Sequence, residues 1–287
     1  VVPGVSGGTI ALVLGIYERL IDSIRSGSSA LGKMVRGDLA GARHWAKRVD
    51  WWFLVPLVTG ILLAVLTLAK LISNLLQDHP EEMAGLFSGL IAGSVVIAWR
   101  LVKRWDARTV GILVAVAVIM FVLLGLREGT SEETVGQLTN PALWAFFLSG
   151  AVAICAMILP GISGSFLLVI LGMYGPVIAA VNDRSLVTLI VFAAGMVLGL
   201  ALFSQVLSWS LEHHHDTIVA ALIGLMAGSM RVLWPWPDGL DSTVLGAPGA
   251  NAVGVTALAV IAFGLVIALG KLGERVPASS ETPERVG

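Results

Sequence analysis

The sequence carries the motif Pro-Gly-x-Ser-Gly twice, at residues 3–7 and at residues 160–164. Proline has no backbone donor and disfavours helical backbone in the residue before it, so each Pro-Gly pair predicts a break between two helical limbs. The limb that follows begins with backbone N–H groups that have no partner inside the helix. Such N–H groups, at the positive end of a helix, attract anions. The motif therefore predicts an anion-binding site at each break.

Small residues and hydroxyl groups surround both predicted breaks. Glycines let an anion approach the backbone closely, and serine and threonine hydroxyls add hydrogen-bond donors. The predicted anion-binding residues are Gly4, Ser6, Gly7, Gly8 and Thr9 in the first copy, and Gly161, Ser163, Gly164 and Ser165 in the second. The alternative is that both motifs are only kinks, with their free backbone groups capped by the serines.

The composition is that of a membrane protein. Hydrophobic residues make up 56% of the 287 residues and charged residues 13%, whereas a soluble domain carries roughly 25% charged residues. Such a chain cannot cover a water-facing surface, which excludes a soluble enzyme. The formal net charge of -1 argues against nucleic-acid binding, which needs a basic face. The single cysteine, Cys155, excludes an intramolecular disulfide.

Apolar stretches that approach the length of a membrane helix, about 20 residues, follow one another along the chain. They cover residues 5–21, 51–76, 83–99, 109–126, 142–159, 162–181, 186–211, 218–234 and 250–270. Residues 142–181 are interpreted as two limbs broken at Pro160. Residues 1–21 are interpreted as the second limb of a similar unit whose first limb is absent.

Lysine and arginine gather in segment 22–50, in loop 100–108 and in the C-terminal tail. Cytoplasmic loops carry an excess of these residues, so we expect a multi-pass protein of the cytoplasmic membrane with these segments and the C-terminus inside the cell. Segment 212–216 belongs to the same side and has three histidines, at 213–215, in place of lysine or arginine, which is the weakest point of this topology. Three adjacent histidines cannot all face one ion from a helix, so we predict no metal and no other cofactor.

Residues 28–49 are too polar to span a membrane, yet their apolar residues recur at helical spacing with basic residues between them. This pattern predicts an amphipathic helix on the anionic inner leaflet, with a solvated loop as the alternative. Residues 272–287 are predicted to be a disordered cytoplasmic tail.

Ionisable residues within spans are costly and usually functional. Glu18 and Arg19 close the first motif, where the second copy has glycine and proline, and we assign both to the substrate site. Arg19 would pair with an anion, and Glu18 would orient Arg19 or take up a proton. Arg231 is placed in the same set, with snorkelling to the headgroups as an equal alternative, whereas snorkelling is preferred for Lys70.

The chain repeats itself in two blocks. Residues 3–21 match 160–178 with 8 identities in 19 positions, and residues 57–99 match 192–234 with 11 identities in 43. Combined with the predicted topology, the matching spans run in opposite directions. The predicted fold is therefore an all-α polytopic membrane protein with two inverted-topology repeats, 1–126 and 142–271, each with a broken re-entrant unit and about three further helices. Such repeats place a substrate near the bilayer midplane.

Glycines spaced by four predict close helix packing in both repeats. They are Gly85, Gly89 and Gly93 in the first repeat, matched by Ala220, Gly224 and Gly228 in the second.

The stretch VVPGVSGGTIALVLGIYERLI, with its echo ILPGISGSFLLVILGMYGPVI, resembles the bacterial polyprenyl-phosphate (undecaprenyl phosphate) translocase family. The resemblance extends over essentially the whole chain, apart from the leading limb. It implies a transporter that flips undecaprenyl phosphate, the lipid carrier of cell-wall precursors, from the outer to the inner leaflet for recycling. Its partners would be this lipid, the surrounding membrane lipids and a coupling proton or cation.

Other functions would leave different signs in the sequence. An ion-coupled carrier of a small soluble anion would use the same motifs and repeats, and it is the main alternative. A lipid phosphatase would need a nucleophile with an acid-base partner at depth, but the histidines lie in loops or at the interface, so no enzyme activity is expected. A passive channel is not supported, because no ring of like charges is evident.

Overall fold

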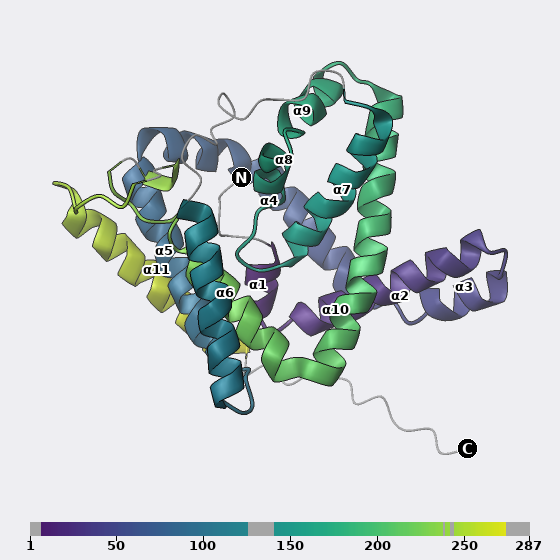
Figure 1. The fold of residues 1–287 in the computed structure, drawn as a ribbon, viewed down its shortest axis with the longest axis horizontal. Coiled ribbons are helices and arrows are strands. Elements are labelled where there is room, and N and C mark those ends of the chain that lie inside the picture. Colours follow the sequence, from purple (N-terminus) through teal and green to yellow (C-terminus); the bar gives the residue numbers. More distant parts are fainter. Residues whose placement is uncertain (1–6, 126–140, 238, 242–243, 274–287) are drawn as a thin grey trace.

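The structure is a computed structural model, and it describes residues 7–125, 141–237, 239–241 and 244–273. Over these residues the chain forms helices and connecting turns, without a β-strand (Figure 1). The elements in chain order are α1 (Gly7–Val13), α2 (Tyr17–Val35), α3 (Leu39–Ala46), α4 (Trp51–Asp78), α5 (Pro80–Trp99), α6 (Ala107–Gly125), α7 (Leu143–Ile158), α8 (Gly164–Ile170), α9 (Tyr174–Asn182), α10 (Leu186–Ser229), the short 3₁₀ helix η1 (Gly239–Asp241) and α11 (Ala252–Gly273).

Five of these helices, α4, α5, α6, α10 and α11, are long and apolar enough to cross a membrane, and α7 is a shorter apolar helix. The prediction of an all-helical, multi-pass membrane protein is therefore confirmed at this level. Helix α10 bends sharply at His214, whose φ of -136° and ψ of 41° are not helical. The predicted span 186–211 and most of the predicted span 218–234 are thus the two limbs of one bent element, which ends at Ser229.

The predicted limbs 5–21 and 162–181 are not continuous helices, because each contains a break that the sequence did not predict. Gly15 ends α1 with a φ of 68°, and Gly172 ends α8 with a φ of 65°. In both turns the next residue donates back over five positions, from Ile16 to Ala11 at 2.9 Å and from Met173 to Leu168 at 2.8 Å. This is the glycine C-cap that ends many helices, because glycine adopts positive φ without a steric cost.

Helix boundaries fall at equivalent positions of the two matching blocks. Helices α1 and α8 cover the same positions of the motif copies, and α2 and α9 both begin at its tyrosine. The corner between α4 and α5 lies at His79, which has a φ of -137° and a ψ of 58°, and the equivalent residue of the second block is His214.

Close packing at the spaced glycines is confirmed. Helix α5 lies against α11, where a Cβ on Gly85 would come within 2.7 Å of the Val255 carbonyl oxygen. The second limb of α10 lies against α6, where a Cβ on Gly228 would come within 2.6 Å of the Ala117 carbonyl oxygen. Each half of the chain therefore packs its glycine-bearing helix against the last long helix of the other half.

Helices α2 and α3 form a hairpin that extends from the rest of the molecule (Figure 1). The predicted helix over 28–49 is thus present as two helices joined at Gly37, whose φ is 77°. Asp38 caps α3 by accepting the backbone N–H of Gly41 at 2.8 Å, and this bond and the nearby Lys33 lower the pKa of the Asp38 carboxyl. Of the predicted tail, residues 272–273 belong to α11, and 274–287 lie outside the described residues.

Candidate functional site

The second Pro-Gly motif breaks the chain between α7 and α8, as predicted. Pro160 and Gly161 are buried, and Gly161 has a φ of 85°. A Cβ on Gly161 would approach the Leu225 carbonyl oxygen to 2.8 Å, so only glycine fits this turn against α10. Ser163 begins α8 with an extended backbone, but its side chain makes no capping hydrogen bond. Its hydroxyl lies 2.7 Å from that of Ser165.

The segment that follows the first motif lies against this break. A Cβ on Gly8 would collide with the carbonyl oxygen of Ile158 and would lie 3.4 Å from the nitrogen of Pro160. The buried hydroxyl of Tyr17 donates to the same Ile158 oxygen at 3.3 Å. That oxygen is at the end of α7, where proline prevents the helix from continuing. Two segments about 150 residues apart in sequence therefore meet at one carbonyl group.

The predicted anion-binding residues differ in their exposure to solvent. Gly7 is exposed, and nothing lies within 4 Å of the position that its Cβ would take. Thr9, by contrast, is fully buried. Gly164 is buried, with Met157 Cγ 2.6 Å from the position of its Cβ, whereas Ser163 and Ser165 are half-buried. Gly4 and Ser6 lie outside the described residues.

Glu18 and Arg19 directly follow Tyr17, on the surface at the start of α2. The Arg19 guanidinium pairs with Asp50, with 2.8 Å between Nε and Oδ2, and it lies 4.5 Å from the ring centre of Phe53. Glu18 accepts a hydrogen bond from the His215 ring at 3.0 Å. The structure therefore connects these two residues to the start of α4 and to the bend of α10 rather than to the two breaks.

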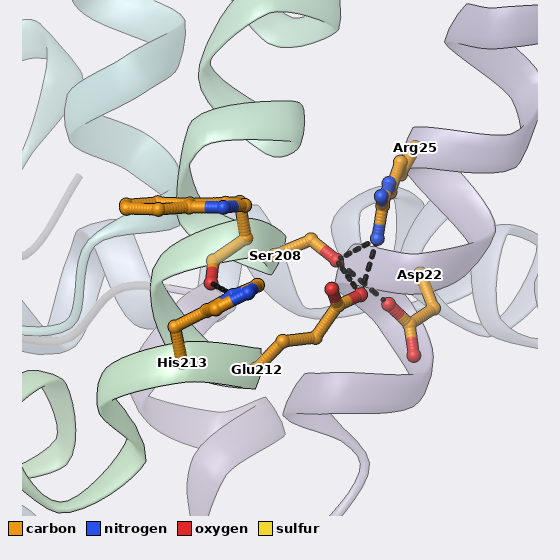
Figure 2. Close-up of polar contacts among 6 residues, drawn as sticks. Asp22, Arg25, Ser208, Glu212 and His213 are labelled. Carbon is orange, nitrogen blue, oxygen red and sulfur yellow. Dashed lines mark hydrogen bonds and ion pairs between the residues drawn. The ribbon is translucent and has the colours of Figure 1, made fainter.

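A polar cluster that the sequence analysis missed joins α2 to α10 near this bend. It consists of Asp22, Arg25, Ser208 and Glu212, and Figure 2 shows the four side chains pointing toward one another. Arg25 donates to Ser208 at 2.9 Å and pairs with Glu212, while the Ser208 hydroxyl donates to Asp22 at 3.0 Å. His213 instead bonds the carbonyl of Trp209 at 2.9 Å. No spacing in the sequence indicates that these residues meet.

The polar cluster borders a small cavity of about 240 Å³, lined among others by Glu18, Lys103 and His215. Next to it, the Asp216 carboxylate accepts the backbone N–H groups of Lys103 and Arg104 at 2.9 and 3.0 Å. The 212–216 segment thus lies beside the basic 100–108 loop, as its place in the predicted topology requires. Among the described residues, no group of three or more metal-ligating side chains is arranged to hold a metal.

Arg231 lies apart from the other predicted residues, in the turn that follows α10. It lines a larger cavity, of about 450 Å³, whose wall is mostly apolar. Its guanidinium carbon is 4.6 Å from the ring centre of Phe121 on α6. The cavity lies where α5 and α11 begin and where α6 and α10 end, which is the end away from loop 100–108.

Comparisons with known proteins agree on one family. The family model described as undecaprenyl phosphate translocase-like matches residues 1–247. A protein of Vibrio cholerae named polyprenyl-phosphate transporter is 42% identical over 246 residues, which cover 84% of this chain and 75% of the relative. A protein of Staphylococcus aureus with the same name is 31% identical over 290 residues, which cover 98% of this chain and 93% of the relative. No solved structure matches the chain.

Proposed function

This chain belongs to the undecaprenyl phosphate translocase-like family, and from that premise we propose that it carries polyprenyl phosphate across the cytoplasmic membrane. The observation that carries the proposal is the similarity, along most of the chain, to two proteins named polyprenyl-phosphate transporter. A phosphate monoester has a charge of roughly -1.5 to -2 near neutral pH, so the bare headgroup cannot cross the bilayer core. A protein has to supply a polar path for the headgroup while the apolar tail stays in the lipid.

The direction that we propose is from the outer to the inner leaflet, which returns the lipid carrier for another round of cell-envelope synthesis. The basic segments face the cytoplasm in this scheme. This orientation is supported by the position of loop 100–108, segment 212–216 and the start of α2, which lie together at one end of the molecule. A coupling proton or cation would enter through the same end, where Glu18 and the polar cluster lie.

We further propose that residues 1–126 and 142–271 are two halves with inverted topology, each with a re-entrant unit at its Pro-Gly motif. The support is the equivalent position of helix boundaries in the two halves and the reciprocal packing of α5 with α11 and α10 with α6. Rocking of one half against the other would expose a central site to each leaflet in turn.

Our candidate for that central site is the place where Gly8 and Tyr17, which follow the first motif, reach the end of α7; we call it the meeting point of the motifs. The half-buried Ser163 and Ser165 hydroxyls lie at the start of α8. Serine hydroxyls and accessible backbone N–H groups are donors suited to phosphate oxygens. The exposed Gly7, with nothing within 4 Å of its Cβ position, leaves the backbone at the start of α1 open to a headgroup.

A leaflet-resolved transport assay tests the proposal. Proteoliposomes are loaded with labelled polyprenyl phosphate in both leaflets, and a phosphatase that cannot enter the vesicles is added outside. The wild-type protein should make the inner-leaflet lipid available for hydrolysis, whereas vesicles without protein should keep it protected. Protection of the inner pool by folded wild-type protein, together with uptake of radiolabelled inorganic phosphate, would favour a carrier of a soluble anion instead.

A further inference from the structure

The cavity at Arg231 has the features of a second binding site, separate from the meeting point of the motifs. We call it the Arg231 cavity; it has a volume of about 450 Å³ and is lined by residues of α5, α6, α11 and the 230–236 turn. Two tryptophans, Trp234 and Trp236, and Phe121 form much of its aromatic wall. Ser88 and Thr256 add hydroxyl groups. An apolar wall with few polar groups is typical of a site for an amphipathic ligand.

Arg231 has no carboxylate partner among the residues that the structure describes. Its guanidinium lies over the Phe121 ring and close to Gly125, where an added Cβ would be 2.5 Å from the guanidinium carbon. By contrast, Arg19 and Arg25 both pair with acids. A half-buried guanidinium keeps its charge and its five donors, so an unpaired one favours an anionic ligand.

The two tryptophans of the wall place their N–H groups differently. Trp236 is 7% exposed, and its Nε1 is buried without a hydrogen-bond partner. The neighbouring Trp234 instead donates its Nε1 to the Gly246 carbonyl at 3.0 Å. The Trp236 N–H group is closed off from the cavity by protein atoms, so Trp236 contributes its ring to the wall and not a hydrogen-bond donor.

The Arg231 cavity is also close to the second motif. Ile162, which follows Gly161, packs against a hydrophobic cluster of Met120, Leu124 and Val232. The direct sequence neighbours of this cluster, Phe121 and Arg231, line the cavity. One layer of side chains therefore connects the cavity wall to the break between α7 and α8.

We propose that the Arg231 cavity binds the headgroup and first apolar units of a prenyl phosphate before the lipid reaches the meeting point of the motifs. This inference rests on the proposed function for its place in transport, and the cavity lies at the outer-leaflet end of the proposed topology. Arg231 holds the phosphate, with the Thr256 hydroxyl as a further donor. The aromatic wall contacts the tail, which a free phosphate ion would not need.

Photolabelling tests the site in the full chain reconstituted in nanodiscs. The probe is a short-chain prenyl phosphate with a diazirine on its hydrocarbon end, and labelled positions are mapped by mass spectrometry. Labelling should fall on residues of the cavity wall and be competed by unlabelled prenyl phosphate, but much less by the prenyl alcohol or inorganic phosphate. Arg231→Gln should reduce labelling about tenfold or more, because a charge-assisted contact is lost.

Three further variants separate binding from folding. Arg184→Gln removes an exposed arginine from the turn before α10 and should leave labelling unchanged. Arg231→Lys should retain part of the labelling, because the charge remains but the planar fork is lost. Thr256→Val removes the hydroxyl at nearly the same side-chain size and should weaken labelling by about 2- to 10-fold. The melting temperature of each variant shows whether it is folded.

The outcomes distinguish this inference from the proposed function. Wild-type labelling in folded Arg231→Gln and Thr256→Val would overturn the site, even if the wild-type protein transports polyprenyl phosphate. Equal competition by inorganic phosphate would overturn its assignment to a lipid. Loss of labelling in Arg231→Gln, combined with a wild-type protein that transports no lipid, would support the site and reject the proposed function.

Discussion

The hydroxyl of Tyr17 donates a hydrogen bond to the carbonyl oxygen of Ile158, 3.3 Å away, and so connects the start of α2 to the break in the second Pro-Gly motif. Both partners are buried, and Ile158 is the last residue of α7. Because residue 160 is a proline and Gly161 turns the chain away, the helix itself cannot satisfy this oxygen in the ordinary way.

Removal of this hydroxyl should destabilise the protein. Tyr17→Phe keeps the ring but leaves the Ile158 oxygen without its donor, at a cost of about 1–3 kcal/mol. The measurement is the melting temperature in detergent together with the transport rate. A Tyr17→Phe protein that melts and transports like the wild type would show that the bond contributes nothing to the junction of the two motifs.

Adjacent glycines of the first motif should respond differently to the same substitution. Gly8→Ala places a methyl group against the Ile158 carbonyl and should cost about 1–3 kcal/mol by overpacking, with loss of transport. Gly7→Ala meets no atom within 4 Å and should fold like the wild type. Thermal melting and transport of the pair are compared. Equal stability of the two variants would mean that the motifs do not pack as closely as described.

Arg19 should contribute more to transport than its ion-pair partner does. We expect Arg19 to exchange the Asp50 carboxylate for the lipid phosphate when the headgroup reaches the basic side, so Arg19→Gln should lower the transport rate about tenfold or more, while Asp50→Asn retains most of it. An exposed pair of this kind contributes about 0–1 kcal/mol to folding, so both variants should remain stable. Equal transport rates in the two variants would assign Arg19 only to the attachment of α2 to α4.

The orientation predicts which loops an impermeant thiol reagent reaches from outside. In a Cys155→Ser background, Ala247→Cys should be labelled in sealed cells and Ala40→Cys should not, and both positions are exposed. Gly41 is a poor probe position because a Cβ there would collide with the capping carboxylate of Asp38. Permeabilised cells are the control, in which both cysteines should react. External labelling of Ala40→Cys in sealed cells would reverse the proposed topology.

The sequence was informative where the residues themselves determine the backbone. Pro160 and Gly161 predicted the break after α7, because no tertiary context allows proline to donate a hydrogen bond. The breaks at Gly15 and Gly172 were missed, because a single glycine inside an apolar run is also common in an unbroken membrane helix. Composition and length predicted the membrane helices, because the thickness of the bilayer sets how many apolar residues a spanning helix needs.

The sequence was uninformative about which surfaces meet. The polar cluster brings Arg25 to Glu212 across 187 positions, and no spacing rule connects them. Glu18 and Arg19 were assigned to the anion site because they follow the first motif, yet the break at Gly15 redirects the chain and gives them His215 and Asp50 as partners. The turn at Gly15 therefore places Glu18 and Arg19 beside partners that the sequence did not predict.

The reciprocal packing of α5 with α11 and of α10 with α6 has a consequence for how the protein is made. Neither half can cover its own glycine-bearing helix, because the helix that covers it is encoded in the other half. During synthesis α5 is in the membrane well before α11 emerges from the ribosome, so the glycine-bearing face of α5 stays uncovered until the last helix of the chain is inserted. A chain that stops before residue 252 would leave that face open to lipid or to quality-control proteases, and two separately expressed halves would have to find each other in the same membrane to assemble.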